Sequence, residues 1–258
     1  MPEDYDFIKE YWENQAKTYK DSYWASWGDI YMINLEMETI NKHIKKDQTI
    51  LDVGCGNGFS TFDLLKNNPK LIIGLDSAEN MIKEAEKKKE ERKIENISFE
   101  IGDIRNLRFN DNSFDVVYTT RVLINLPNWE MQKQGIKECI RVTKKGGMVI
   151  FSEAFWEPLA LLNSFRILKG LPPLVEHDFN RYLKKQKLNE FLNSLNLKFE
   201  INDFSSIYYL GSRFLRELVT DERLYSGYSN PINKIFYDIE REYSGGDFGI
   251  QQAYIIKK

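Results

Sequence analysis

The chain has 258 residues, of which 42% are hydrophobic, 14% aromatic and 29% charged. This composition excludes a disordered chain, and the length is sufficient for one large domain with its own core. The formal net charge is −3. A protein that binds nucleic acid or an anionic membrane would therefore need a local basic patch, and none stands out in the sequence.

Cysteine usage and the first residues bear on location. Cys55 and Cys139 are too few for a disulfide framework or a multi-thiolate zinc site, and we expect both to be reduced. The opening residues lack the pattern of a secretory leader, and no apolar run approaches the length of about 18 residues that a membrane span needs. We expect a cytoplasmic protein without a membrane span or a metal site. The sequence does not predict an oligomeric state.

The first 48 residues are predicted to form a helical N-terminal cap. Large residues recur at helical spacing from Phe7 to Tyr19, and a second apolar stripe runs from Ile33 to Ile44. An aromatic loop with Trp24 and Trp27 lies between the two stripes.

From residue 49 onward, short apolar runs alternate with helical stretches. The runs cover residues 49–53, 71–75, 97–101, 114–119 and 148–151, and the predicted helices cover 60–67, 78–93 and 129–142. Unbroken apolar runs are typical of parallel strands buried on both faces. Further along, a helix over 182–195 and strands over 198–205 and 249–256 are predicted, with insertions at about 156–182 and 211–246, the second of them irregular. The pattern over 49–258 predicts an α/β, Rossmann-like domain.

Ligands bind at the carboxyl ends of the strands in an open α/β sheet. The first strand is followed by three alternating glycines within Gly54–Gly58, which let the backbone approach a ligand closely. Asp76 ends the second strand, where a carboxylate can accept both hydrogen bonds of a ribose diol. Asp103 and Ile104 follow the third strand and suit an adenine. Alone, Asp76 could be a helix cap and Asp103 a turn residue, but together they predict a nucleoside site.

The glycine spacing argues against a nicotinamide dehydrogenase. Dinucleotide-binding loops carry Gly-x-Gly-x-x-Gly, and Phe59 occupies the position of the third glycine.

Five segments, 50–58, 73–76, 102–104, 112–117 and 141–147, closely resemble the successive motifs of class I S-adenosylmethionine-dependent methyltransferases. The resemblance covers about residues 48–155, and the departures at Arg108 and Lys145, where proline is usual, lie in turns. It implies a seven-stranded, mostly parallel sheet with an antiparallel last strand, and S-adenosylmethionine as the cofactor, with S-adenosylhomocysteine as its product. The cofactor-binding residues implied are Tyr19, Asp52, Gly54, Gly56, Asn57, Gly58, Asp76, Ser77, Met81, Asp103, Ile104 and Thr120.

Methyl transfer from a sulfonium is an in-line displacement that mainly requires the acceptor to be aligned and dehydrated. An alcohol acceptor benefits from a general base, whereas an anionic acceptor needs only a cationic clamp. The candidate catalytic residues are Glu153, after the fifth strand, and His177, in the first insertion. The candidate substrate-binding residues are Arg121, Arg166, Arg181 and Tyr208. Each has an alternative structural role as a cap, an ion-pair partner, a surface charge or a core residue.

The two insertions resemble the acceptor lids of small-molecule methyltransferases. Ser-Glu-Ala-Phe after the fifth strand is unlike the Asn-Pro-Pro-Tyr type signature of amino-methylating nucleic-acid enzymes. We expect the acceptor to be an oxygen of a small metabolite, such as a sugar, a sugar nucleotide or a phosphate- or phosphoramidate-type group. Methyltransferase sequences that resemble this one occur in bacterial surface-glycan pathways. By analogy, we expect a role in polysaccharide biosynthesis. The alternatives are a non-catalytic module that binds the cofactor and a nucleic-acid methyltransferase.

Overall fold

A seven-stranded sheet forms the centre of the protein in the computed structural model, which describes residues 5–220 and 227–258. The strand order is β3-β2-β1-β4-β5-β7-β6, and β7 is antiparallel to both of its neighbours while the other pairs are parallel. The strands are β1 (Thr49–Val53), β2 (Leu71–Asp76), β3 (Ile97–Ile101), β4 (Phe114–Thr120), β5 (Thr143–Ala154), β6 (Lys198–Asn202) and β7 (Gln251–Lys257). This topology confirms the predicted Rossmann-like fold with its antiparallel last strand.

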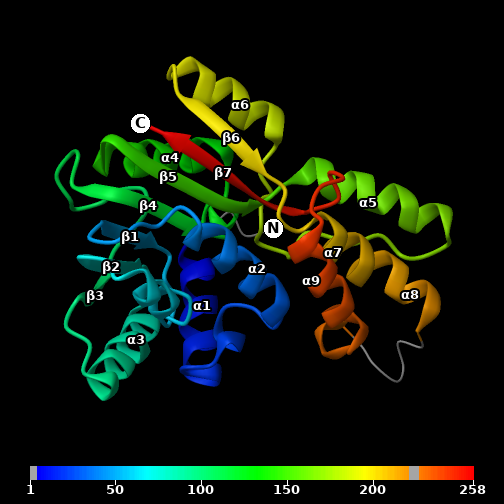
Figure 1. Ribbon diagram of the computed structural model, residues 1–258, viewed down its shortest axis with the longest axis horizontal. Coiled ribbons are helices and arrows are strands. Elements are labelled where there is room, and N and C mark those ends of the chain that lie inside the picture. The colour runs from blue at the N-terminus through cyan, green and yellow to red at the C-terminus, as the bar shows by residue number, and fades with distance from the viewer. Residues whose placement is uncertain (1–4, 221–226) are drawn as a thin grey trace.

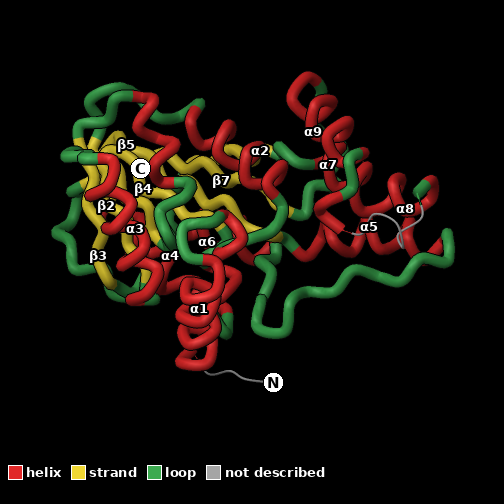
Figure 2. Tube along the Cα trace, turned by 90° about the horizontal axis from the view of Figure 1, so that it is seen from below, coloured by secondary structure: helices red, strands yellow, loops and turns green. Residues whose placement is uncertain are grey.

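Helices cover the sheet and extend beyond one of its ends. They are α1 (Tyr5–Tyr19), α2 (Ile30–Asn41), α3 (Glu79–Arg92), α4 (Trp129–Val142), α5 (Trp156–Leu168), α6 (Lys185–Ser194), α7 (Ser206–Leu210), α8 (Arg216–Val219) and α9 (Ile232–Glu242). The segment predicted as a helix over 60–67 is a 3₁₀-helix, η2 (Thr61–Asn67). Helices α5, α7, α8 and α9 form a group beyond the end of the sheet, as both views show (Figure 1, Figure 2).

The insertion at 211–246 is mostly helical over its described residues, so the prediction of an irregular segment was wrong for most of it, while residues 243–246 have no regular structure. It contains a π-helix, η4 (Gly211–Leu215), followed by α8, a 3₁₀ turn η5 (Gly227–Ser229) and α9. Part of the predicted insertion, residues 221–226, lies outside the described residues. Gly211 favours a break in helical structure when the sequence is considered alone. In the fold it makes room for the ring of Phe236, which a Cβ would approach to 2.1 Å.

Both faces of the sheet are buried, which explains the unbroken apolar runs. Ile50 and Val116 belong to one apolar cluster, and their chain neighbours Leu51 and Val117 belong to another. Successive side chains of a strand point to opposite faces, so a strand covered on both sides needs apolar residues at every position.

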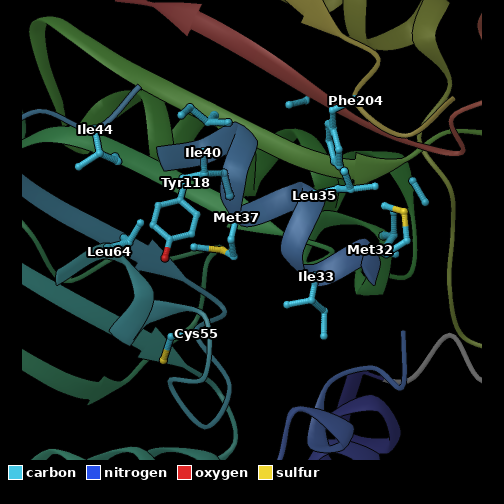
Figure 3. Packing of buried hydrophobic residues seen from close by; sticks show 14 of the residues in the cluster. Met32, Ile33, Leu35, Met37, Ile40, Ile44, Cys55, Leu64, Tyr118 and Phe204 are labelled. Carbon is cyan, nitrogen blue, oxygen red and sulfur yellow. The ribbon is translucent and has the colours of Figure 1, made fainter. Parts of the chain in front are cut away.

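Helix α2 is the most deeply buried part of the N-terminal segment. Seven of its 12 residues are buried, including Met32, Glu36 and Ile40. Figure 3 shows its apolar side chains near Tyr118 of β4 and Phe204, which follows β6. A helix with apolar residues on most sides belongs in a protein interior.

None of the described helices has both the length and the apolar character that a bilayer crossing requires.

Ile40→Ala tests how far the fold depends on the packing of α2. Ile40 is fully buried, so its truncation leaves a cavity and should lower the free energy of unfolding by about 2–5 kcal/mol. Asn34→Ala, at an exposed position of the same helix, should change it by less than about 0.5 kcal/mol. Chemical denaturation measures both variants, and equal effects would contradict the interior placement of α2.

Candidate functional site

A cavity of about 710 Å³ opens at the carboxyl ends of the parallel strands. One part of its lining comes from the loops after β1, β2, β3 and β4, where the sequence predicted a nucleoside site. Other parts of the lining come from α1, from the aromatic loop before α2, from residues 174–180 and Tyr182, and from Tyr209 and Arg213, with further contributions from Ala154, Leu159, Tyr228, Ile250 and Gln251. The cavity therefore joins the motif-bearing strand ends to the helical additions.

The glycines after β1 all have a left-handed backbone, with φ of +81° at Gly54, +54° at Gly56 and +74° at Gly58, a conformation that favours glycine. A Cβ on Gly54 would lie 2.1 Å from the side chain of Val122. At Gly56, Met81 Sδ at 3.9 Å is the only atom that a Cβ would meet among the residues described. Gly56 thus presents open backbone to the cavity, whereas Gly58 packs against Phe99 and does not line it.

Asp76 is fixed at the end of β2 by two backbone donors. The N–H of Gly56 donates to its Oδ2 at 2.9 Å, and the N–H of Ala78 donates to its Oδ1 at 2.9 Å. Burial raises the pKa of Asp76 against these hydrogen bonds. Each carboxylate oxygen can accept a further hydrogen bond, and Asp76 lines the cavity beside Ser77 and Met81. The carboxylate can therefore receive the two hydroxyls of a ribose.

One carboxylate oxygen of Asp52, in β1, could accept a hydrogen bond from a ligand. Its Oδ2 accepts a hydrogen bond of 2.6 Å from Thr61, while its buried Oδ1 makes no hydrogen bond of good geometry in the described part of the chain, although the buried hydroxyl of Tyr118 lies close enough to lower the pKa of Asp52. Burial raises the pKa of Asp52 to about 7. A buried acceptor without a well-placed donor is unusual in proteins. Because Asp52 lines the cavity, a donor group of a ligand, such as an amine, fits there.

Asn57 fastens the aromatic loop onto the glycine-rich turn. Its Nδ2 donates to the carbonyl oxygens of Lys20 and Ser22, at 2.7 and 2.8 Å, and its Oδ1 accepts from the N–H of Phe59 at 3.2 Å. The side chain that the resemblance assigned to the cofactor is thus engaged within the protein. Tyr19, just before this loop, lines the cavity, as does Thr120 after β4.

Asp103 and Ile104, which follow β3, have different positions relative to the cavity. Ile104 lines the cavity, and Asp103 does not. The Asp103 carboxylate accepts hydrogen bonds of 3.0 Å from the Nε of Arg105, whose guanidinium lies 3.8 Å from the ring centre of Tyr5. Tyr5 itself lines the cavity. Asp103 therefore acts on the site through Arg105 and Tyr5.

Glu153 does not lie where a substrate would meet it. It is fully buried and absent from the cavity lining. Its carboxylate accepts hydrogen bonds from Thr119 Oγ1 at 2.7 Å and from the N–H groups of Val122, Leu123 and Ile124 at 3.0–3.3 Å. Burial raises its pKa to about 7. The prediction of a catalytic role is corrected: Glu153 shapes the turn after β4.

Three of the predicted substrate-binding residues are likewise engaged elsewhere and do not line the cavity. Arg166, buried in α5, donates to the carbonyl oxygen of Pro172 at 2.9 Å. Arg181 donates to two carbonyl oxygens of its own loop. The hydroxyl of Tyr208 donates to Asp29 Oδ1 at 2.7 Å. These side chains stabilise the walls of the cavity because they are buried or bonded within the protein.

Arg121 and His177 do line the cavity. Arg121 forms an ion pair with the buried Glu36 of α2, and its guanidinium lies 4.9 Å from the ring centre of Trp27. His177 is exposed and lies 4.6 Å, between ring centres, from Phe179. Arg121 is therefore held rigidly, whereas His177 stands at the edge of the site.

Sequence reasoning missed part of the lining. Arg213, in η4, forms an ion pair with Asp29 and lines the cavity, as do Tyr182 and Tyr228. Tyr209, one residue after the predicted Tyr208, also lines it. The aromatic pattern could not separate these two tyrosines, because successive residues of a helix differ by about 100° and both positions are apolar in character.

The sequence profile of a methyltransferase domain family matches residues 44–194. An uncharacterized methyltransferase of Schizosaccharomyces pombe is 41% identical over 120 residues, which are 44% of this chain and 42% of that protein. The chain thus spans less than half the length of that relative. A ubiquinone biosynthesis O-methyltransferase of Coxiella burnetii is 26% identical over 185 residues, which are 70% of this chain and 76% of that protein.

A solved structure shares the fold over nearly the whole chain. Phosphoethanolamine N-methyltransferase 1 of Haemonchus contortus, in complex with phosphoethanolamine and S-adenosylhomocysteine, matches with a TM-score of 0.63 and 14% identity. The match covers 98% of this chain and 48% of that one. At this identity the likeness shows the fold alone.

Glu153→Gln should weaken the pH dependence of the protein's stability. Because the pKa of Glu153 rises from 4.5 to about 7 on folding, the folded state binds more protons between these pH values. The free energy of unfolding therefore falls as the pH rises through that window. In the variant, the fall measured by denaturation between pH 4.5 and 8 should be smaller by up to about 3 kcal/mol.

Glu91→Gln, at an exposed position of α3, is the control and should keep the original pH dependence. An unchanged profile in Glu153→Gln would contradict the protonation of the buried carboxyl.

Proposed function

The chain belongs to the methyltransferase domain family and is a methyltransferase that uses S-adenosylmethionine, and on this premise we propose that it methylates an oxygen atom of a small metabolite. The observation that carries the proposal is the continuity of one cavity. Its lining includes Gly56 and Asp76 at the strand ends and also residues of the segments 174–182 and 209–213. A cofactor and an acceptor can therefore meet inside it.

The strand-end part of the cavity suits the cofactor. The Asp76 carboxylate would accept the ribose hydroxyls, and the Oδ1 of Asp52 would accept the ammonium of the methionine part. Met81 and Ile104 offer apolar surface to the adenine. S-adenosylmethionine, when bound, supplies a methyl group on a sulfonium, which an aligned nucleophile can displace. The protein's part is then to hold the acceptor in line and keep water out.

The remainder of the cavity supports a small acceptor. The whole cavity, about 710 Å³, is in the size range of small-molecule and cofactor sites, and aromatic residues such as Trp27 and Tyr209 line it. We propose a sugar, a sugar nucleotide or a phosphate- or phosphoramidate-type group as the acceptor, with polysaccharide biosynthesis as the setting. His177 is the candidate base for a hydroxyl acceptor, whereas an anionic oxygen would need none.

A phenolic oxygen is a second candidate acceptor. The Coxiella burnetii relative is named for O-methylation in ubiquinone biosynthesis, and its similarity extends over 70% of this chain. The aromatic lining also suits a phenol, because aromatic side chains favour stacked or edge-on contacts with another ring.

Charge argues against the nucleic-acid alternative. Among the described residues that line the cavity there is no lysine. The two arginines among these lining residues, Arg121 and Arg213, pair with different carboxylates and offer two separate cations, not a continuous basic surface. A polynucleotide would need a basic surface to track its phosphates.

The proposal includes a cytoplasmic location, supported by the free and buried state of Cys55 and Cys139.

Asp76→Asn tests the ribose site. Replacing a charged acceptor by a neutral amide should weaken S-adenosylhomocysteine binding about 10- to 100-fold, because hydrogen bonds to charged groups contribute about 1.5–3 kcal/mol. Calorimetric titration measures the affinity. Glu79→Gln, an exposed position three residues further on, should bind as the original protein does, and unchanged binding in Asp76→Asn would reject the assignment.

Transfer of a radiolabelled methyl group tests the reaction. The protein and labelled S-adenosylmethionine are incubated with an extract of bacterial metabolites, and the products are separated by size and by sensitivity to nuclease and protease. We expect label in a small fraction that resists both enzymes, whose compound mass analysis would identify. Label in RNA, DNA or protein would overturn the acceptor class, and cofactor binding without any label would favour a non-catalytic module.

A further inference from the structure

Helix α2 carries the counter-charges of both arginines in the cavity. Asp29, at its N-cap, pairs with Arg213, and Glu36 pairs with Arg121. The two acids are seven positions apart, so they lie on the same side of the helix with a separation of about 10 Å along its axis. Both carboxylates are fully buried. One helix therefore fixes two cations at two different points of the cavity.

The two arginines face different parts of the cavity. Arg121 directly precedes Val122, whose side chain packs on Gly54, so Arg121 belongs to the strand ends and the cofactor. Arg213 lies among tyrosines of the helical additions, 5.6 Å from the ring centre of Tyr209 and 4.9 Å from that of Tyr228. Arg213 therefore belongs to the part that remains for the acceptor.

The local backbone turns Arg213 and Tyr209 toward the cavity. They lie in and just before η4, a π-helix, and single π-turns within helices are frequent at functional sites. Tyr208 and Ser212, the residues directly before Tyr209 and Arg213, are buried, and the Ser212 hydroxyl donates to the carbonyl oxygen of Tyr208 at 2.6 Å. Residues four positions apart lie on the same side of a helix, so Tyr209 and Arg213 face the cavity together while Tyr208 and Ser212 are buried.

Arg213 retains the capacity to bind a ligand. A guanidinium has five N–H donors in a planar fork. In the described structure the Nη1 donates to Ser212 Oγ at 3.1 Å and the Nη2 donates to Asp29, which leaves further donors for the cavity. Asp29 is itself shared, because the hydroxyl of Tyr208 also donates to it. With only 11% of its side chain exposed, Arg213 is held in one orientation before a ligand arrives.

We propose that Arg213 binds an anionic group, a phosphate or a carboxylate, of the methyl acceptor, while Tyr209 and Tyr228 contact its flat body. A fixed guanidinium matches both anions through paired hydrogen bonds. The aromatic rings around it limit competition from water, which strengthens such contacts. The inference rests on the proposed function, because it requires that this part of the cavity receives the acceptor.

Binding of simple probes tests the inference without turnover. Phenyl phosphate, benzoate and neutral benzamide are titrated by calorimetry into the protein saturated with S-adenosylhomocysteine. At least one anion should bind 10-fold or more tightly than benzamide, and the comparison of the two anions distinguishes a phosphate from a carboxylate acceptor. Equal binding of all three probes would overturn the proposal.

Variants assign the preference to Arg213. Arg213→Met should abolish the difference between the anions and benzamide while the affinity for S-adenosylhomocysteine stays within twofold, and Arg213→Lys should keep part of it. Arg92→Met, at an exposed position of α3, should keep all of it. An anion preference that survives in Arg213→Met would overturn the assignment.

A second variant keeps the test decisive if the loss of Arg213 alone destabilises the fold, because Asp29 would then be buried without its cation. Asp29→Asn/Arg213→Gln removes both charges together and should show the same loss of anion preference. The probe titration tests the anion site and the label-transfer assay tests methyl transfer. Either result can be negative without the other, since binding of phenyl phosphate or benzoate requires no methyl transfer.

Discussion

The burial of Glu36 is the constraint on which the cavity depends. A carboxylate in the interior of a protein is costly unless several donors surround it, and Glu36 meets donors from three separate strands or strand ends. Ser152 of β5 donates at 2.6 Å, Gln251 of β7 donates at 2.5 Å, and Arg121 after β4 forms the ion pair. Burial still raises the pKa of Glu36. These bonds join an N-terminal helix to the sheet where the site opens.

Asp29 extends the same arrangement into the helical additions. It accepts hydrogen bonds from the N–H of Met32 and the hydroxyl of Tyr208 and pairs with Arg213. Segments nearly two hundred residues apart in the sequence are thereby tied to one helix. Because α2 is packed on most sides by apolar residues (Figure 3), it holds both arginines in defined positions, and the two parts of the cavity are built on one support.

The cofactor part of the site was largely predictable, and the acceptor part was not. Gly56, Asp76 and Ile104 line the cavity because each lies at or shortly after the end of a strand, and the ends of parallel strands meet at one edge of the sheet. Glu153 also lies near the end of a strand, β5, yet its carboxylate faces four donors of β4 and of the turn after it. Position after a strand places a residue near the site, but the available hydrogen-bond donors decide where its side chain points.

The sheet, its buried strands and the glycine-rich turn could be predicted from the amino-acid order, since these depend on local apolar patterns and on backbone conformations that glycine favours. Which polar residues face the cavity depends on contacts that form only when the chain folds. Arg166 and Arg213 are both arginines within the predicted insertions, but Arg166 is used to fasten α5 while Arg213 lines the cavity. Their roles follow from partners brought together by folding, such as Asp29, and no local pattern records partners that are distant in the chain.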